Sequence, residues 1–372
     1  MIKKLENAGL GYHIKAENTT DSIGSIPLRR LVYRVKEIPA SLFPLIWDFG
    51  TLDQEAEKKY VTQMVKKSIN ENIDLVVEVL QRSQAYMRSR KDECSFVSLR
   101  DVERTLTVLN WFLTKNDILE KLTDKTGNQN TFQMSLIVSL GVSYWARLED
   151  RAPYAAKMAE VLGIEEFKFE RTIVASQEIF IDEVKLEPTI AKNEALMENV
   201  WMKTICNQLT IPLFLVGKPG SSKSLAKTIV TDVMQGPNSY SDLYKGLKEI
   251  HVVSFQCSPL ATPAGILSTF KQCQKYQEKR DLKSFSAVCI LDEVGLAEDS
   301  PKMPLKALHP LLEDGCIGDE RKQAWMKVSF IGISNWALDP AKMNRGILLS
   351  RGVPTQNDLI KIAHGKDLKK IF

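Results

Sequence analysis

The feature that most constrains this chain is an apolar run followed by a loop of small residues and lysine, Pro212-Leu-Phe-Leu-Val-Gly-Lys-Pro-Gly-Ser-Ser-Lys-Ser-Leu-Ala226. The apolar residues 213–216 predict a buried strand, and a helix is expected to begin near Lys223. A strand, a glycine-containing loop and a helix that opens with Lys-Ser are typical of a phosphate-binding loop. The sequence therefore predicts a nucleotide site on a strand–loop–helix unit.

Each residue type in this loop suits the binding of phosphate. Gly217 and Gly220 are expected to take positive φ and to aim backbone N–H groups at phosphate oxygens. Lys223 is expected to reach the β and γ phosphates, and the hydroxyl of Ser224 to ligate Mg²⁺. Ser222 stands where the usual pattern has a second glycine, which reduces backbone freedom there. The residues expected to bind nucleotide are Gly217, Lys218, Pro219, Gly220, Ser221, Ser222, Lys223 and Ser224.

The composition is that of an ordinary globular protein and excludes few classes of protein. A length of 372 residues favours two or three domains, and a net charge of only +4 does not indicate nucleic acid or a membrane surface as a partner. The six cysteines form no C-x-x-C pair, so neither a zinc site nor a disulfide framework is expected. With no signal peptide and no apolar span, we expect a cytoplasmic protein with reduced thiols.

The first half of the chain is expected to be helical. Residues 1–30 are polar and aperiodic and are expected to be poorly structured, 31–35 form a candidate strand, and Trp47 and Phe49 are expected core anchors. Apolar residues recur at helical spacing after that point. The helical patterns cover residues 53–88, 98–113, 131–148, 154–162, 165–180 and 193–209.

The second half alternates strands with helices. The expected strands after the loop are residues 250–255, 286–291, 328–334 and 347–349. Such alternation predicts an α/β fold with a mainly parallel sheet covered by helices on both faces. Ligands of such sheets bind at the carboxyl ends of the strands, where the loop, Asp292-Glu293 and Asn335 are all expected.

Polar residues at these strand ends are candidate catalytic groups. Asp292 would hold Mg²⁺ and Glu293 would polarise the water that attacks the γ phosphate, although acidic residues often end strands for other reasons. Asn335 is either an Asx-turn residue or a polar sensor that orients this water. Arg345 and Arg351 flank the last strand, and each is either a surface charge or an arginine finger for a neighbouring site.

A further arginine lies in the helical half. Ser98 and Asp101 predict a capping box at the start of a helix. Arg100 lies in the first turn, where a cation opposes the helix dipole. Arg100 is either a solvated side chain or a residue aimed at a phosphate.

The order of these motifs resembles the core of AAA+ ATPases. More specifically, the sequence resembles the mysterin family, giant RING-finger E3 ubiquitin ligases with a dynein-like array of AAA+ units. The residues that carry this resemblance are Phe214-Leu-Val-Gly-Lys-Pro-Gly-Ser-Ser-Lys-Ser-Leu-Ala226, Leu291-Asp-Glu-Val-Gly-Leu-Ala-Glu-Asp-Ser-Pro301, Leu308-His-Pro-Leu-Leu-Glu-Asp-Gly315 and Ile333-Ser-Asn-Trp-Ala-Leu-Asp-Pro-Ala-Lys-Met-Asn-Arg-Gly346. The resemblance is strong over residues 195–355 and looser before them.

The resemblance implies a division of the chain. Residues 31–120 would be the helical lid of a preceding AAA+ unit, with Arg100 as its arginine sensor, and residues 121–192 a helical connector. Residues 193–372 would be an AAA+ core without a lid of its own. Arg100 would then serve a nucleotide bound upstream of Met1, and Arg345 the site of a neighbouring unit.

The function implied is that of an ATP-binding and ATP-hydrolysing module with Mg²⁺ as cofactor. Its nucleotide state would bias movement between neighbouring AAA+ units, and ubiquitin-pathway partners would be reached only through a longer parent protein, because no RING is present here. The alternative is a structural module that holds ATP without turnover. A dynein-like motor is a third possibility, although no sustained heptads indicate a stalk.

Overall fold

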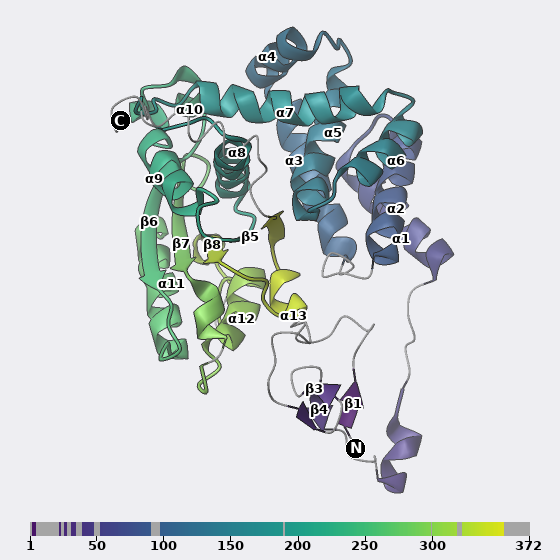
Figure 1. Ribbon diagram of the computed structural model, residues 1–372, viewed down its shortest axis with the longest axis vertical. Helices are drawn as coiled ribbons and strands as arrows, with labels where there is room; N and C mark the ends of the chain where they lie inside the picture. The colour runs from purple at the N-terminus through teal and green to yellow at the C-terminus, as the bar shows by residue number, and fades with distance from the viewer. Residues whose placement is uncertain are drawn as a thin grey trace, which may run out of the picture.

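The first half of the chain is a bundle of helices. The computed structural model describes residues 2–4, 22–23, 26–27, 31–34, 39–47, 53–90, 97–188, 190–298, 300–317 and 322–352. The helices of this half pack beside one another in Figure 1, and α7 runs across the top of the view. They are α1 (Gln54–Ser68), α2 (Ile73–Ser89), α3 (Leu99–Leu113), α4 (Asn116–Thr126), α5 (Thr131–Ser143), α6 (Ala152–Leu162) and α7 (Glu166–Asp182).

Local signals explain where several of these helices begin and end. The capping box predicted for α3 is confirmed, because Ser98 N–H donates to Asp101 Oδ2 at 2.9 Å and the Ser98 side chain caps the helix in return. The single helical pattern expected over residues 53–88 is divided in two, because the chain turns at Asn72 with φ of +54°. Glycines with positive φ, Gly127 and Gly163, end α4 and α6.

The second half is an α/β domain, as the alternation of strands and helices predicted. Its strands are β5 (Leu213–Gly217), β6 (Glu249–Gln256), β7 (Phe285–Asp292), β8 (Ser329–Ser334) and β9 (Ile347–Arg351). Its helices are α8 (Glu194–Leu209), α9 (Lys223–Val233), α10 (Asp242–Lys245), α11 (Pro263–Gln277), α12 (Leu308–Glu313) and α13 (Pro340–Met343).

All strands of the main sheet run parallel in the order β6-β7-β8-β5-β9. The register aligns Val216 with Ser334 of β8 and with Ser350 of β9, so the strand of the phosphate loop is flanked on both sides. Because the strands are parallel, their carboxyl ends meet at one edge, which we call the carboxyl edge. The other edge, where the strands begin, is called the opposite edge.

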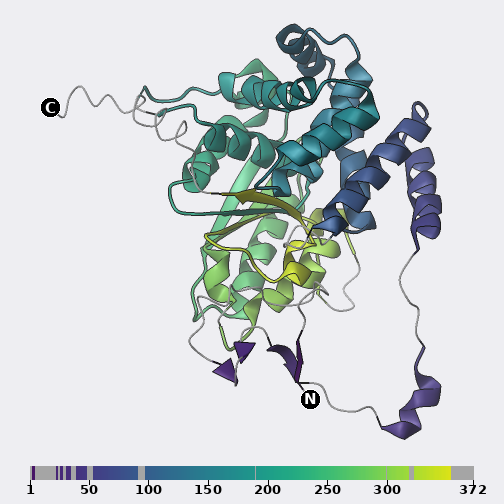
Figure 2. The same ribbon diagram turned by 45° about the vertical axis from the view of Figure 1, so that its right-hand side comes forward.

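The core explains how the two halves hold together. Side chains alternate across each strand, so Leu213 and Leu215 face one apolar cluster and Phe214 and Val216 the other. The first cluster continues into α1–α9, and the second is completed by α11 and α12. Figure 2 shows the sheet nearly edge-on between these layers. The helical half is therefore part of the same packed core as one face of the sheet.

The N-terminal segment contributes short strands. β1 (Ile2–Lys4) pairs antiparallel with β4 (Leu31–Arg34), and β2 (Ser22–Ile23) with β3 (Ile26–Pro27). Most of residues 1–30 lie outside the described residues, as does Phe49. The expectation that Trp47 anchors the core is wrong, because its side chain is 80% exposed.

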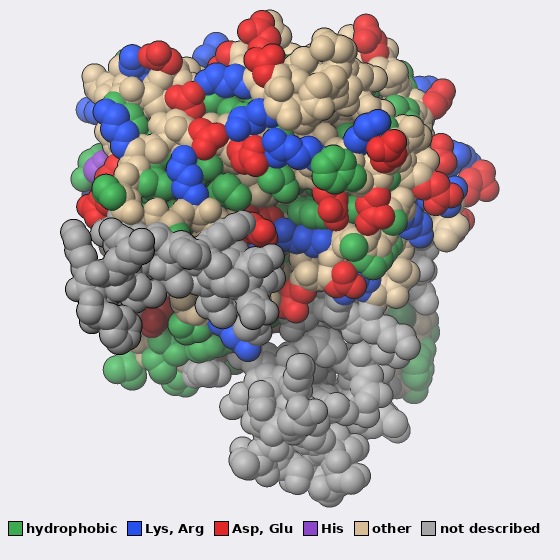
Figure 3. All heavy atoms as spheres, turned by 45° about the horizontal axis from the view of Figure 1, so that its top comes forward, with side chains coloured by type: hydrophobic (Ala, Val, Ile, Leu, Met, Phe, Trp, Pro, Cys, Tyr) green, Lys and Arg blue, Asp and Glu red, His purple; other side chains and the backbone are tan. Residues whose placement is uncertain are grey.

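Two further features of the fold are the character of its described helices and the distribution of charge on its surface. Within the described ranges, no helix has both the length and the apolar character needed to cross a bilayer. On the face shown in Figure 3, acidic and basic side chains are interspersed. This mixture is what a net charge of +4 in a chain of this size leads one to expect.

Candidate nucleotide site

The phosphate loop connects β5 to α9 at the carboxyl edge. β5 ends at Gly217 and α9 begins at Lys223, as the sequence predicted. Gly220 has φ of +86°, and Ser222 has φ of +57° in the left-handed region that favours glycine. Ser222 therefore has the left-handed backbone that the glycine of the usual pattern would adopt easily, although serine carries a Cβ. A non-glycine residue in this conformation costs about 1–2 kcal/mol.

Gly217 is needed for a different reason from the one expected. Its φ is not among the positive values, but a Cβ at this position would lie 2.9 Å from the Cβ of Arg351 on β9. It would also lie 3.1 Å from Ser221 Oγ. The glycine is required because the neighbouring strand and the loop approach its backbone closely.

Lys223 lies inside the loop and is bound by it. Its Nζ donates to Gly217 O, to Lys218 O at 3.0 Å and to Ser221 Oγ at 3.2 Å. Burial lowers the pKa of Lys223, and the charge of Asp292 opposes that effect. No carboxylate of the described residues lies within ion-pair distance of this ammonium. The loop thus holds a largely buried cation whose partners are all neutral.

Asp292 and Glu293 follow β7 at the same edge. Asp292 Oδ1 accepts the backbone N–H of Glu293 at 3.1 Å, and Lys227 Nζ from α9 lies 3.9 Å from Asp292 Oδ2. Glu293 is exposed and has φ of +51°, a second left-handed residue at this edge. Strained backbone of this kind clusters at functional sites in proteins.

Asn335 follows β8, which lies between β5 and β7. The next residue, Trp336, packs against Gly295 so closely that a Cβ on that glycine would lie 2.7 Å from the indole ring. The segments that carry Asn335 and Glu293 are therefore in direct contact. The structure brings together the phosphate loop, the two carboxylates and Asn335, as the sequence led us to expect.

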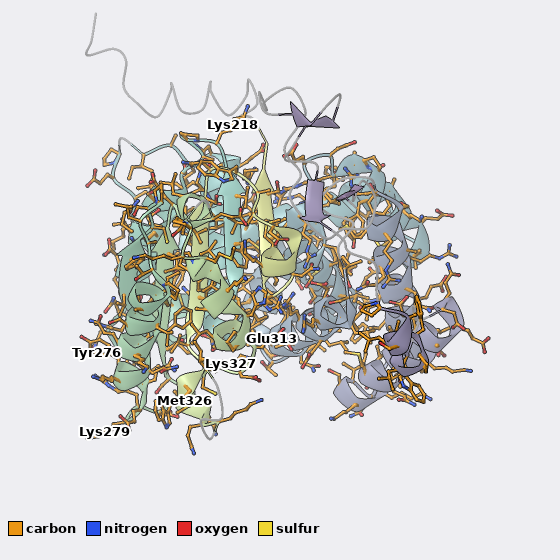
Figure 4. All side chains as sticks on the ribbon, turned by 90° about the horizontal axis from the view of Figure 1, so that it is seen from below. Lys218, Tyr276, Lys279, Glu313, Met326 and Lys327 are labelled. Carbon is orange, nitrogen blue, oxygen red and sulfur yellow. The ribbon has the colours of Figure 1, made fainter. Side chains whose placement is uncertain are left out.

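Two of the three predicted arginines, Arg100 and Arg345, lie away from the phosphate loop and converge on the carboxylate of Glu313. Glu313 Oε1 lies 2.6 Å from Arg100 Nη2 and 3.3 Å from Arg345 Nε. All three line a cavity of about 500 Å³ that Arg104 and Lys327 also border. Figure 4 shows Lys218 of the phosphate loop at one end of the sheet, with Glu313 and Lys327 toward the other.

Arg104 fastens α3 to the segment that carries Arg345. Its guanidinium donates to Asn344 O at 3.1 Å and to Gly346 O at 3.0 Å, the carbonyls on either side of Arg345. Asp101 holds Arg104 in turn at 3.0 Å. Sequence reasoning missed Arg104, because the two carbonyls that it binds are more than two hundred residues away along the chain.

Arg351 lies at the end of β9, opposite Gly217, and its guanidinium binds α8. Its Nη2 lies 2.5 Å from Glu198 Oε2 and donates to Glu194 O at 2.8 Å. Glu198 is fully buried and also binds Arg151, which precedes α6, at 3.0 Å. Arg351 therefore links the sheet to the helical half.

Two further residues that sequence reasoning missed lie beneath the loop on α8. Asn199 Nδ2 donates to Ser221 O at 2.8 Å, and Lys203 Nζ donates to Lys223 O at 2.6 Å. Both side chains are buried. Their spacing of four residues puts them on one face of the helix. Because α8 also contains other polar residues, the sequence offered no signal that singles these two out.

The donor set bears on which metal the site could hold. The described residues contain no cluster of three or more His, Cys, Asp or Glu that could hold a metal ion. Ser224 is exposed in the first turn of α9, and Asp292 ends β7. A hydroxyl and one carboxylate suit Mg²⁺, which is commonly bound by few protein ligands together with substrate phosphates.

Comparison with known proteins agrees with this geometry. Residues 189–358 match the family described as the RNF213 AAA domain. The α/β half of this chain is an AAA domain of the RNF213 family. RNF213 proteins are the mysterins, so the family resemblance found in the sequence is confirmed, and so is the AAA+ fold class.

Similar proteins match nearly the whole chain. It is 52% identical to "E3 ubiquitin-protein ligase RNF213" of Homo sapiens over 389 residues, 52% identical to the Mus musculus protein of the same name, and 49% identical to "E3 ubiquitin-protein ligase rnf213-beta" of Danio rerio. Each match covers 98% of this chain. The chain spans 7% of the length of each of these relatives.

Proposed function

We propose that this AAA domain binds ATP with Mg²⁺ at the carboxyl edge and hydrolyses it. Residues 217–224 would cradle the phosphates, and Lys223 would pair with the β and γ phosphates. Ser224 and Asp292 would hold Mg²⁺, which neutralises charge on the phosphates. Glu293 would orient the attacking water, with Asn335 as a polar sensor beside it.

The observation that carries this proposal is the environment of Lys223. The buried ammonium of Lys223 binds only neutral oxygen atoms, and burial lowers its pKa although the charge of Asp292 opposes the shift. A phosphate bound in the loop would supply a counter-charge, so the residues present fit a nucleotide. The adjacent left-handed Ser222 and Glu293 support a binding role for this edge, because the fold maintains strain there.

The second part of the proposal concerns the opposite edge. Arg100 and Arg345 converge on Glu313 beside a cavity, and neither is near the phosphate loop of this chain. We propose that both would contact the phosphates of a nucleotide bound by a preceding AAA+ unit, with Glu313 as their counter-ion otherwise. Arg104 would keep Arg345 and α3 together, so that the two arginines move as one body.

This arrangement has a consequence for turnover. An arginine finger contributes about 10³–10⁵ in rate to related phosphoryl transfers. Arg345 lies at the opposite edge, and Arg351 is paired with Glu198, so neither is placed to assist the nucleotide at Lys223. We therefore propose that this chain alone hydrolyses ATP slowly, and that a neighbouring AAA+ unit completes the site.

The wider role follows only by analogy. In a longer protein, the nucleotide state of this domain would bias movement against its neighbouring units in the cytoplasm. Ubiquitin transfer belongs to the relatives named E3 ubiquitin-protein ligase and is proposed only for a protein that includes the remainder of their length.

Substitution of Glu293 by glutamine distinguishes a slow ATPase from a structural module that holds ATP. In an ATPase, Glu293→Gln should remove the residual phosphate release while ATP remains bound, because the loop is unchanged. The control is Glu278→Gln, an exposed glutamate at the end of α11. If phosphate release is equal in the wild type, Glu293→Gln and Glu278→Gln, hydrolysis at this site is refuted.

A further inference from the structure

Helix α8 presents buried hydrogen-bond donors to the back of the phosphate loop. Asn199 and Lys203, 1% and 0% exposed, donate to Ser221 O at 2.8 Å and to Lys223 O at 2.6 Å. Both acceptors are carbonyls of the loop backbone itself, at the start of α9. The loop is therefore bound from behind by two side chains that reach no solvent.

Burying these two polar side chains is energetically unfavourable. Burial, with the nearby charges of Lys227 and Lys223, lowers the pKa of Lys203 to about 7, although Asp292 opposes the shift. Asn199 Oδ1 has no hydrogen-bond partner among the described residues. Apolar side chains of similar volume would avoid both penalties, and such replacements of buried charges are often neutral or stabilising. Stability of the fold is therefore a poor explanation for these two residues.

The peptide units that Asn199 and Lys203 contact give a better reason for their presence. Each carbonyl belongs to the same peptide as the N–H of the following residue, so Asn199 acts on the N–H of Ser222 and Lys203 on that of Ser224. These N–H groups lie at the start of α9, where a helix leaves its N–H groups without intrahelical partners. A hydrogen bond to the oxygen of a peptide polarises the unit and makes its N–H a stronger donor.

We propose that Asn199 and Lys203 are positioning residues that fix and polarise the Ser222 and Ser224 N–H groups for phosphate oxygens of the nucleotide. This inference rests on the proposed function, because it concerns the same loop. The side chains touch neither phosphate nor metal and act only through the backbone. Lys203 has the stronger role, because its contact is the shorter of the two and its amine is the more polar donor.

The test compares Lys203→Met with the wild type in the whole 372-residue chain, using Mg·ADP as the probe. Calorimetry should show ADP affinity reduced about five-fold, the change that one lost hydrogen bond produces. The melting temperature should stay the same or rise, because a buried amine is replaced by an apolar chain of similar length. The ¹⁵N resonance of the Ser224 amide should move upfield even without nucleotide.

The control is Thr204→Val on the same helix, whose hydroxyl donates to Val200 O at 2.8 Å and bonds the side chain of Tyr244 rather than the phosphate loop. It should change neither the ADP affinity nor the Ser224 resonance. Asn199→Leu should instead weaken ADP binding and move the Ser222 resonance.

The outcomes separate this inference from the proposed function. Lys223→Ala should remove ADP binding. If it does while Lys203→Met binds ADP like the wild type with an unchanged Ser224 resonance, the inference is overturned and the nucleotide site stands. If Lys203→Met binds ADP more weakly only because its melting temperature falls, Lys203 has a structural role alone and the inference is also overturned. If Lys223→Ala binds ADP normally, both proposals fail.

Discussion

The backbone at Ser222 makes a quantitative prediction. Serine there has φ of +57°, which costs an L-residue about 1–2 kcal/mol relative to ordinary backbone. Ser222→Gly removes that strain but adds about 0.5–1 kcal/mol of conformational entropy to the unfolded chain. The difference predicts that the glycine variant is more stable than the wild type by roughly 0.5–1 kcal/mol.

Denaturant unfolding followed by circular dichroism measures this difference. The matched control is Ser222→Ala, which removes the hydroxyl but keeps the Cβ that causes the strain. No capping hydrogen bond is made by the Ser222 side chain, so the alanine variant should match the wild type in stability. ADP affinity should stay within about two-fold in both variants, because the loop N–H groups are retained.

Two results would refute this reasoning. One is a glycine variant less stable than the wild type, because the entropic cost would then exceed the strain. The other is an alanine variant as stable as the glycine variant, because the hydroxyl rather than the left-handed backbone would be the source of the effect.

Three further predictions concern other residues of the two halves. Glu293→Gly should stabilise the fold by roughly 0.5–1 kcal/mol by relieving φ of +51° and should abolish phosphate release, whereas Glu293→Gln should abolish release without that gain in unfolding experiments. Glu198→Gln should lower the free energy of unfolding, measured in denaturant, by about 3–5 kcal/mol, because it leaves Arg151 and Arg351 without their buried counter-charge. A loss under about 0.5 kcal/mol would contradict the importance of these ion pairs. Burial lowers the pKa of Lys203 to about 7 in the folded chain, from about 10.5 in the unfolded chain. Between these two pH values the unfolded state binds more protons than the folded state. The free energy of unfolding should therefore rise with pH by about 1.4 kcal/mol per pH unit in that window. The stability gained at high pH is lost as pH falls toward 7. The free energy of unfolding of the wild type, minus that of Lys203→Met, should therefore be larger at pH 9 than at pH 7.5, by the slope given above. Equal differences at the two pH values would contradict the buried amine.

The sheet and the residues at its carboxyl edge could be predicted from the sequence. Apolar runs such as residues 286–291 have few alternatives to a buried strand once they alternate with helices. Because parallel strands end at one edge, the loop, Asp292-Glu293 and Asn335 had to meet once the strands were identified. The order of the motifs also identified the family before any comparison.

Contacts between distant segments could not be predicted. The roles of Arg100 and Arg345 were inferred separately, and only the folded chain brings both to the carboxylate of Glu313. Lys203 appears in the sequence as an ordinary helical lysine, because the pattern does not reveal that its amine reaches the loop. Trp47 was expected in the core on the strength of its apolar ring, but its side chain is largely exposed.

Calorimetric titration of ATP into the 372-residue chain with Mg²⁺ tests the central claim most directly. The account predicts binding to one site per chain that Lys223→Ala abolishes. Lys279→Ala, an exposed lysine at the far end of the sheet from the loop, should bind like the wild type. Undiminished binding by Lys223→Ala, or no binding by the wild type at millimolar ATP, would contradict a nucleotide site at the carboxyl edge.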